Sequence, residues 1–122
     1  MTKQPIWLIL ISSEPYTCPK AASGIDAALA CGAFGQKVTV VFEGGGLNIL
    51  CATHNAPNGE RNLFKQVASF PLYEIDSVLA VTNDKDIQHR LAGQAPSDLV
   101  ITAISHDELG RHCANATHIL SF

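Results

Sequence analysis

Thiols are the side chains of this sequence best suited to covalent chemistry, and one of them lies where a thiol can react. Cys18 follows an apolar run and a polar loop, at or just before the start of a predicted helix. There the helix dipole and free backbone amides favour a thiolate, and Lys20 adds positive charge, although Pro19 removes one amide donor. Cys18 is therefore the candidate catalytic thiol. The four cysteines are far apart in the sequence: Cys18, Cys31, Cys51 and Cys113.

No spacing among the cysteines and histidines matches a metal site. There is no Cys-x-x-Cys, so the thiols are expected to be free in a reducing compartment, and Cys31 and Cys51 are explained as small apolar side chains. The five histidines include no His-x-His and no pair four residues apart. They are His54, His89, His106, His112 and His118. We expect surface histidines, and we assign no metal ligand.

One other feature could belong to an active site, and it has a simpler explanation. Three glycines, Gly44 to Gly46, follow Glu43 and could turn backbone amides toward a phosphate. No Lys-Ser/Thr pair follows them and the pattern is not Gly-x-Gly-x-x-Gly, so a tight strand-to-helix turn explains them better. The sequence also lacks Gly-x-Ser-x-Gly, which argues against a hydrolase triad. We therefore assign no cofactor-binding residue and no cofactor, and a small-ligand or nucleotide-binding module using 43–46 remains an alternative.

Alternating strands and helices would position these groups. Apolar or β-branched runs predict strands at 6–12, 37–42, 77–81, 98–103 and 118–122, and 77–81 has the composition of a strand buried on both faces. Helical patterns lie between them, at 22–35, 47–51, 60–70, 84–92 and 105–114. This order predicts a single three-layer α/β domain over 1–122, with a mainly parallel sheet of about five strands and helices on both faces. In such sheets the chemistry lies just past the carboxyl ends of the strands.

Capping residues mark where several of these helices should begin and end. Gly35 is predicted as a left-handed cap, and Gly93 as the end of the helix that Asp84 caps. Asn58 is predicted to cap 60–70, which Pro71 would terminate. Ser105 and Glu108 have the spacing of a capping box at the start of the last helix.

Composition and charge exclude several classes of partner. The chain is 47% hydrophobic and 16% charged, with a net charge of −3 and no cluster of basic residues, so we expect no direct nucleic-acid binding. The longest apolar run, 6–11, is too short to cross a membrane and does not resemble a signal peptide, so we expect a cytoplasmic protein. A lightly charged, apolar chain also suits a subunit that buries surface in an oligomer.

An ordered set of motifs resembles the DsrE/DsrF-like sulfur-relay family. The segments are 6–15, 21–30 and 38–46 with Leu47 and Leu50 after it; 70–75 and 117–122 resemble the TusC (DsrF) branch most. The resemblance implies a small α/β fold and assembly with TusB-like and TusD-like subunits into a heterohexamer. That complex is implied to accept persulfide sulfur from a TusA-like donor and pass it to a TusE-like acceptor for 2-thiolation of the tRNA wobble uridine. In the related DsrEFH complex the resemblance implies sulfur oxidation instead.

The resemblance also bears on which subunit carries the sulfur. In the TusD-like branch a cysteine at the end of the central strand is implied to carry it, and the matching place here is about Val81, which has no thiol. The resemblance therefore implies a non-catalytic structural subunit, with no catalytic residue to transfer. On its own such a chain should behave poorly or self-associate, forming a homo-oligomer. The alternative is a sulfur carrier that uses Cys18.

Overall fold

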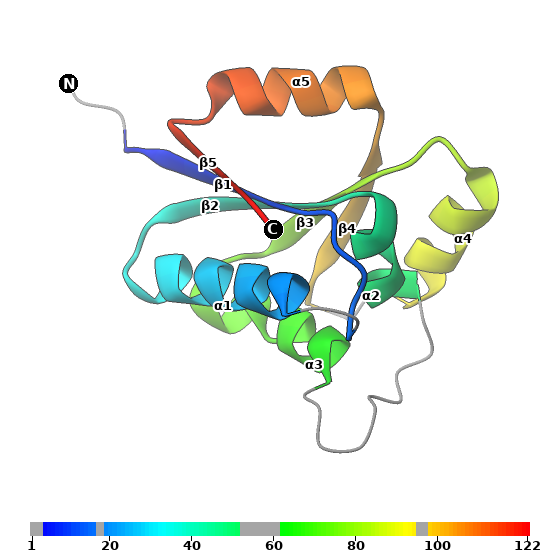
Figure 1. Cartoon of the computed structure of the whole chain (residues 1–122), viewed down its shortest axis with the longest axis horizontal. Coiled ribbons are helices and arrows are strands. Elements are labelled where there is room, and N and C mark those ends of the chain that lie inside the picture. Colours follow the sequence, from blue (N-terminus) through cyan, green and yellow to red (C-terminus); the bar gives the residue numbers. More distant parts are fainter. Residues whose placement is uncertain (1–3, 17–18, 52–61, 95–97) are drawn as a thin grey trace.

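Five parallel strands form the sheet at the centre of the molecule (Figure 1). The computed structural model describes residues 4–16, 19–51, 62–94 and 98–122. The strand order is β4-β3-β2-β1-β5, and every neighbouring pair is parallel. The strands are β1 Ile6–Ile11, β2 Lys37–Phe42, β3 Ser77–Val81, β4 Val100–Ile104 and β5 His118–Ser121. The predicted α/β fold with a five-stranded parallel sheet is therefore confirmed.

Helices connect each strand to the next. They are α1 Lys20–Ala33, α2 Leu47–Cys51, α3 Leu63–Ala68, α4 Lys85–Gln94 and α5 His106–Asn115, with short 3-10 turns η1 Gly44–Gly46 and η2 Phe70–Tyr73. From β1 to β4 the chain moves across the sheet in one direction, so right-handed crossovers place α1 to α4 on one face. The step from β4 to β5 returns across the sheet, which places α5 on the opposite face (Figure 1). Both faces carry helices, as predicted, but α5 covers the second face alone.

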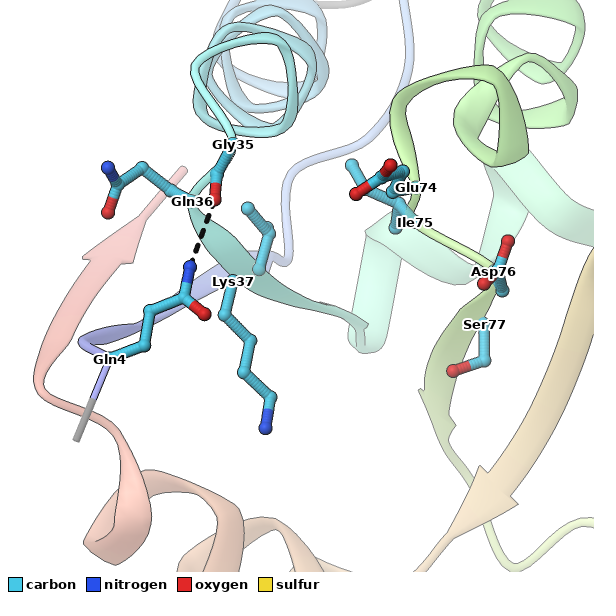
Figure 2. A pocket seen from close by; sticks show the side chains of 9 residues that line it. Gln4, Gly35, Gln36, Lys37, Glu74, Ile75, Asp76 and Ser77 are labelled. Atoms are coloured by element: carbon cyan, nitrogen blue, oxygen red, sulfur yellow. Dashed lines mark hydrogen bonds between the residues drawn. The ribbon is translucent and has the colours of Figure 1, made fainter.

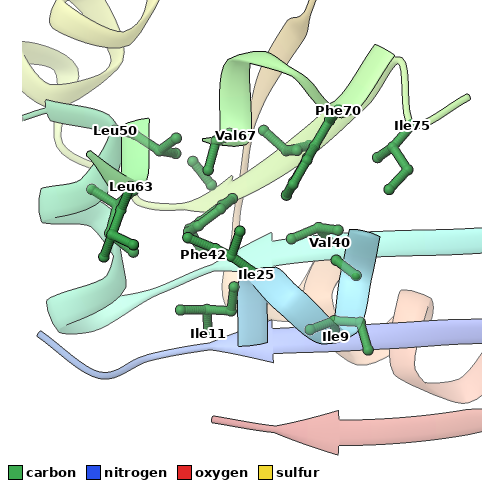
Figure 3. Packing of buried hydrophobic residues seen from close by; sticks show 14 of the residues in the cluster. Ile9, Ile11, Ile25, Val40, Phe42, Leu50, Leu63, Val67, Phe70 and Ile75 are labelled. Carbon is green, nitrogen blue, oxygen red and sulfur yellow. The ribbon is translucent and has the colours of Figure 1, made fainter. Parts of the chain in front are cut away.

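The larger core lies between the sheet and α1 to α4. Successive residues of a strand point to opposite faces, so Ile9 and Ile11 of β1 face α1 while Leu8 and Leu10 face α5. Figure 3 shows this core, which includes Ile9, Ile11, Ile25, Val40, Phe42, Leu50, Leu63, Val67, Phe70 and Ile75. The core on the α5 side has four buried residues: Leu8, Val41, Val81 and Ile104. The molecule is thus stabilised mainly on one face of its sheet.

The third helix differs from its prediction. α3 spans Leu63–Ala68 rather than 60–70, and its cap is Asn62, whose side chain accepts a hydrogen bond from the Lys65 amide at 3.1 Å. The predicted cap Asn58 lies outside the described residues. Pro71 does not terminate α3, because it lies near the start of the turn η2. At that position the backbone N–H would have no hydrogen-bond partner within the turn, so proline is tolerated.

Other element limits moved by a few residues. α4 continues through Gly93 to Gln94, so Gly93 does not end it. The fourth strand begins at Val100 and reaches Ile104, because Ile104 pairs with Val81 at the end of β3. Gly35 has the predicted left-handed conformation, with φ of 75°, and both hydrogen bonds of the capping box at Ser105 are present.

Candidate functional site

The carboxyl ends of the parallel strands meet at one edge of the sheet, where a site would be expected. At the end of β3 this edge carries Val81, whose side chain is only 4% exposed. Val81 packs in the α5-side core with Leu8, Val41 and Ile104. Hydrocarbon side chains surround it, and its own isopropyl group has no atom that could carry sulfur. The strand 77–81, expected to be central, is β3 and lies between β4 and β2, while β2 is the middle strand of the sheet. β3 ends in a closed apolar core.

The turn after β3 is closed by hydrogen bonds within the chain. The Thr82 hydroxyl accepts from the Asp84 amide at 3.0 Å, and the Gln88 side chain donates to the Thr82 carbonyl at 3.2 Å. The Asp84 carboxylate accepts from the amides of Asp86 at 2.8 Å and Ile87 at 3.3 Å. Asp84 thus caps α4, as the sequence predicted, and its carboxylate is occupied with the helix amides.

The three glycines after β2 are explained by close packing. A Cβ on Gly46 would overlap the backbone carbonyl of Ile11, and a Cβ on Gly45 would lie 2.9 Å from the Glu14 amide nitrogen. The Gly46 amide donates to the Glu43 carbonyl at 2.9 Å, which closes the turn η1. The glycines therefore let α2 start directly against the end of β1. This is the tight turn that the sequence predicted as one of its two interpretations.

Two of the four thiols can be placed. Cys31 in α1 is partly buried, and burial raises the pKa of its thiol above the ordinary value. Cys113 in α5 is also partly buried and packs against the α5-side core. The candidate thiol Cys18 and the side chain of Cys51 lie outside the described residues. Neither Cys31 nor Cys113 lies at the end of a strand.

The histidines that the structure describes lie on the surface. Four of them, His89, His106, His112 and His118, are exposed, and His54 lies outside the described residues. Within the described residues no group of three or more His, Cys, Asp or Glu side chains could hold a metal ion. The ring of His118 in β5 stacks on Trp7 in β1, with centroids 4.2 Å apart and planes tilted by 30°. The sequence could not show this pair, because it depends on the pairing of β1 with β5.

Two hollows lie at the opposite, amino end of the sheet. One has a volume of about 340 Å³ and is lined by Lys37 at the start of β2 and by Glu74, Asp76 and Ser77 ahead of or at the start of β3 (Figure 2). Gln4 borders it and donates from its side chain to the Gly35 carbonyl at 2.9 Å. The second hollow, about 420 Å³, lies between the end of α1 and η2. The sequence did not predict a site at the amino end of the sheet, although Leu72, which lines the second hollow, fits no core pattern.

No helix in the described ranges has both the length and the apolar character needed to cross a bilayer. The structure thus defines a small α/β domain with a fully parallel sheet and a hydrocarbon side chain at the end of its inner strand β3. Its fold matches the crystal structure of the ychN protein from E. coli with a TM-score of 0.71, over 98% of this chain and 100% of that chain. The two sequences are 13% identical, so this likeness shows the fold alone.

Sequence comparison narrows the class further. Residues 6–81 match the DsrE/DsrF-like family. The chain is also 30% identical over 117 residues to the protein TusC homolog of Vibrio parahaemolyticus serotype O3:K6 (strain RIMD 2210633), covering 93% of this chain and 95% of that protein. The chain belongs to the DsrE/DsrF-like family. The resemblance noted in the sequence, including its TusC branch, is therefore confirmed.

Proposed function

We propose that this chain is a subunit of a sulfur-relay complex of the TusBCD/DsrEFH kind, and that it supplies contacts rather than the thiol that carries sulfur. Family membership and the 30% identity to a TusC homolog support the sulfur-relay role. The observation that carries the non-catalytic role is the buried hydrocarbon side chain of Val81 at the end of β3.

The chemistry of sulfur relay explains why Val81 matters. A thiolate of the acceptor attacks the outer sulfur of the donor persulfide, the S–S bond of the donor breaks, and the donor leaves as a thiolate. The acceptor thus needs an accessible thiol of lowered pKa. Val81 offers none, and the pKa of Cys31 is shifted the wrong way by burial. The thiol at this step would then belong to a partner subunit.

The partners follow from the family resemblance. The chain would assemble with TusB-like and TusD-like subunits, two copies of each in a heterohexamer. The complex would take persulfide sulfur from a TusA-like donor and pass it to a TusE-like acceptor. The sulfur would end in the 2-thio group of the tRNA wobble uridine. Direct contact with tRNA is not part of the proposal, since the chain has a net charge of −3.

The experiment uses a version of the chain without any thiol, in which Cys18, Cys31, Cys51 and Cys113 are all replaced by alanine. It is co-expressed with the TusB-like and TusD-like chains of the same genome, and the purified complex is given a TusA-like persulfide donor. We expect the complex to form and to transfer sulfur at the rate of the unmodified complex. Circular dichroism of the variant chain controls for its folding.

Two results would count against the proposal. If the thiol-free chain assembles but the complex no longer transfers sulfur, a cysteine of this chain carries it. The single variant Cys18→Ser then shows whether Cys18 is that carrier. If it is, mass spectrometry should detect a persulfide on Cys18 of the unmodified chain and none on the chain with Cys18→Ser. If the unmodified chain does not co-purify with either partner, it is not a subunit of this complex.

A further inference from the structure

The hollow of about 340 Å³ at the amino end of the sheet opens where two neighbouring strands separate. β2 pairs with β1 from its first residue, Lys37, but its pairing with β3 begins only at Val40 and Val78. β3 in turn pairs with β4 from Ser77. The amino end of each strand is therefore held by the strand on its other side, and the hollow lies between the two ends. We call it the polar hollow.

The separation of the strands leaves backbone groups at the polar hollow. No backbone hydrogen bond joins 37–38 to 74–76, all of which are described residues. The Asp76 carbonyl instead accepts from the Val100 amide at 2.9 Å, on the β4 side. An inner strand ordinarily bonds to both of its neighbours. The peptide groups of 37–38 and 74–76 that face the polar hollow therefore remain available to a ligand.

Charged side chains of both signs border the polar hollow. In Figure 2, Lys37 lies on the β2 side, and Glu74 and Asp76 lie on the β3 side. Among the described residues, none of these three side chains makes an ion pair or a side-chain hydrogen bond. One cation and two anions thus face a single hollow without partners in the described part of the chain.

The backbone of Glu74 has a conformation that favours a different residue. Glu74 follows the turn η2 with φ of 64° and ψ of 24°, which is the left-handed region. Glycine adopts this conformation without a steric cost, whereas a residue with a Cβ does not. Residues held in this region are concentrated at ligand sites, where the side chain has a role that offsets the strain. The carboxylate of Glu74 is therefore the feature that the turn itself does not explain.

We propose that the polar hollow binds a small basic amino acid, a ligand with one carboxylate and two cationic groups. Lys37 would bind the carboxylate, and Glu74 and Asp76 would bind the two cations, so that each charge in the hollow is matched. The unpaired peptide groups would accept or donate the remaining hydrogen bonds. A volume of about 340 Å³ lies at the small end of ligand sites, which suits a ligand of this size. The proposal does not depend on the sulfur-relay function.

Backbone amide NMR of the full chain, titrated with L-lysine, tests the proposal. We expect saturable shifts at 36–38 and 74–77, with a dissociation constant in the millimolar range, because the charged side chains are exposed. Added salt should weaken the binding. Two analogues of the same carbon chain separate the contacts: cadaverine lacks the carboxylate, and L-norleucine lacks the second cation. Each should bind about fivefold more weakly or less well still, because it leaves part of the hollow unmatched.

Two variants assign the charges of the ligand to their partners. Lys37→Met should weaken the binding of L-lysine and strengthen that of cadaverine, because it removes the cation that repels a diamine. Asp76→Asn should weaken both. Lys85→Met and Asp107→Asn are the matched controls at the carboxyl end of the sheet, and they should leave the binding of both ligands unchanged. All four side chains are exposed, so folding should survive the changes.

Glu74 allows the role of its carboxylate to be separated from the role of its backbone. Glu74→Gly should raise the melting temperature by a few degrees, because glycine relieves the left-handed strain, and should weaken the binding of L-lysine. Glu74→Gln keeps a side chain in the strained conformation and removes the charge. It should weaken the binding of L-lysine without the gain in melting temperature.

Three outcomes would overturn the proposal. L-lysine could cause no saturable shifts at concentrations well above the millimolar range, or shifts that saturate away from 36–38 and 74–77. L-lysine, cadaverine and L-norleucine could bind equally well, which would indicate ionic attraction without a site. The binding of L-lysine could remain unchanged in Lys37→Met and in Glu74→Gly, with both variants shown to be folded by circular dichroism.

Discussion

The proposal that this chain has no sulfur-carrying thiol depends on Val81, and the burial of this position can be tested directly. In a chain whose four native cysteines are replaced by alanine, Val81→Cys would place a thiol at the end of β3. Because this side chain is buried among Leu8, Val41 and Ile104, we expect its pKa to be raised and its reaction with a disulfide reagent to be slow. The rate should rise sharply in denaturant. A native rate equal to that of a free thiol would mean that this strand end is open.

Cys31 offers a second test at a thiol that is already present. Burial raises the pKa of Cys31, so the folded chain holds this proton more tightly than the unfolded chain does. The resulting stability is present at neutral pH and is lost as the pH rises through the thiol's ordinary value of 9.0 and on through the raised value of the folded state. Urea unfolding from pH 7 to pH 10 should show the decline. Cys31→Ala should reduce it; an unchanged decline would assign it to other groups.

Gly46 shows how closely the turn after β2 packs. Gly46→Ala should lower the free energy of unfolding by about 2–4 kcal/mol, because its Cβ would overlap the Ile11 carbonyl and the backbone must move. Gly110→Ala is the control. It lies in α5, where a Cβ would meet nothing within 4 Å, so alanine should stabilise the helix by about 0.5–1 kcal/mol. Equal effects of the two changes in chemical denaturation would contradict this account.

At the scale of elements, the exposed capping box of α5 should contribute to the stability of this helix. Ser105 accepts from the Glu108 amide at 3.2 Å, and the Glu108 carboxylate accepts from the Ser105 amide at 3.2 Å. Ser105→Ala should cost about 1 kcal/mol. Because α5 alone covers its face of the sheet and has no fully buried residue, the loss should appear as faster hydrogen exchange across α5 while β2 stays protected.

A matched change in α1 controls for the loss of a hydroxyl group in general. Ser23→Ala removes an exposed hydroxyl from the first half of α1, where the structure shows no bond from this side chain. It should change the free energy of unfolding by less than about 0.5 kcal/mol. If Ser23→Ala is as costly as Ser105→Ala, the capping box is not the source of the stability.

The helices and strands could largely be predicted from the sequence, but the residues at which several of them begin and end could not. Continuous apolar runs such as 77–81 have few alternatives to a buried strand, and alternation with helices then determines a parallel sheet. The start of α3 was wrong because Asn58 and Asn62 are equally good caps, and only packing of the helix chooses between them. The end of α4 was wrong because an exposed Gly93 meets nothing that would force the helix to stop.

In the candidate site, likewise, the features set by neighbouring residues could be predicted and those set by the fold could not. The tight packing of 44–46 and the capping role of Asp84 follow from local rules, and both were among the predicted interpretations. The two hollows at the amino end of the sheet were not predicted, because they join residues from α1, β2 and the segment before β3, which only the folded chain brings together. Leu72, a large apolar residue that fits no core pattern, was the signal that could have indicated the second hollow.

At the scale of the whole molecule, β5 protects the most apolar strand from becoming an edge. β5 pairs with β1 through residues 118–121, and the amide of Ser12 donates to the Phe122 carbonyl at 2.9 Å. Phe122 also packs against the larger core, where a Cβ on Gly24 would lie 3.1 Å from it. β5 itself is exposed along its length, so its contribution to stability is mostly through this pairing and through Phe122.

Removing residues 118–122 should therefore do more than lower stability. The apolar strand 6–11 would become a sheet edge with unpaired amides and carbonyls, which is a template for pairing with other chains. We expect the shortened chain to aggregate at concentrations where the full chain is soluble, measured by light scattering. Phe122→Ala separates the two causes, because it keeps the β5 pairing but removes the core contact. It should destabilise the chain by about 1–3 kcal/mol without aggregation, and aggregation equal to that of the shortened chain would assign the effect to lost packing rather than to the open edge.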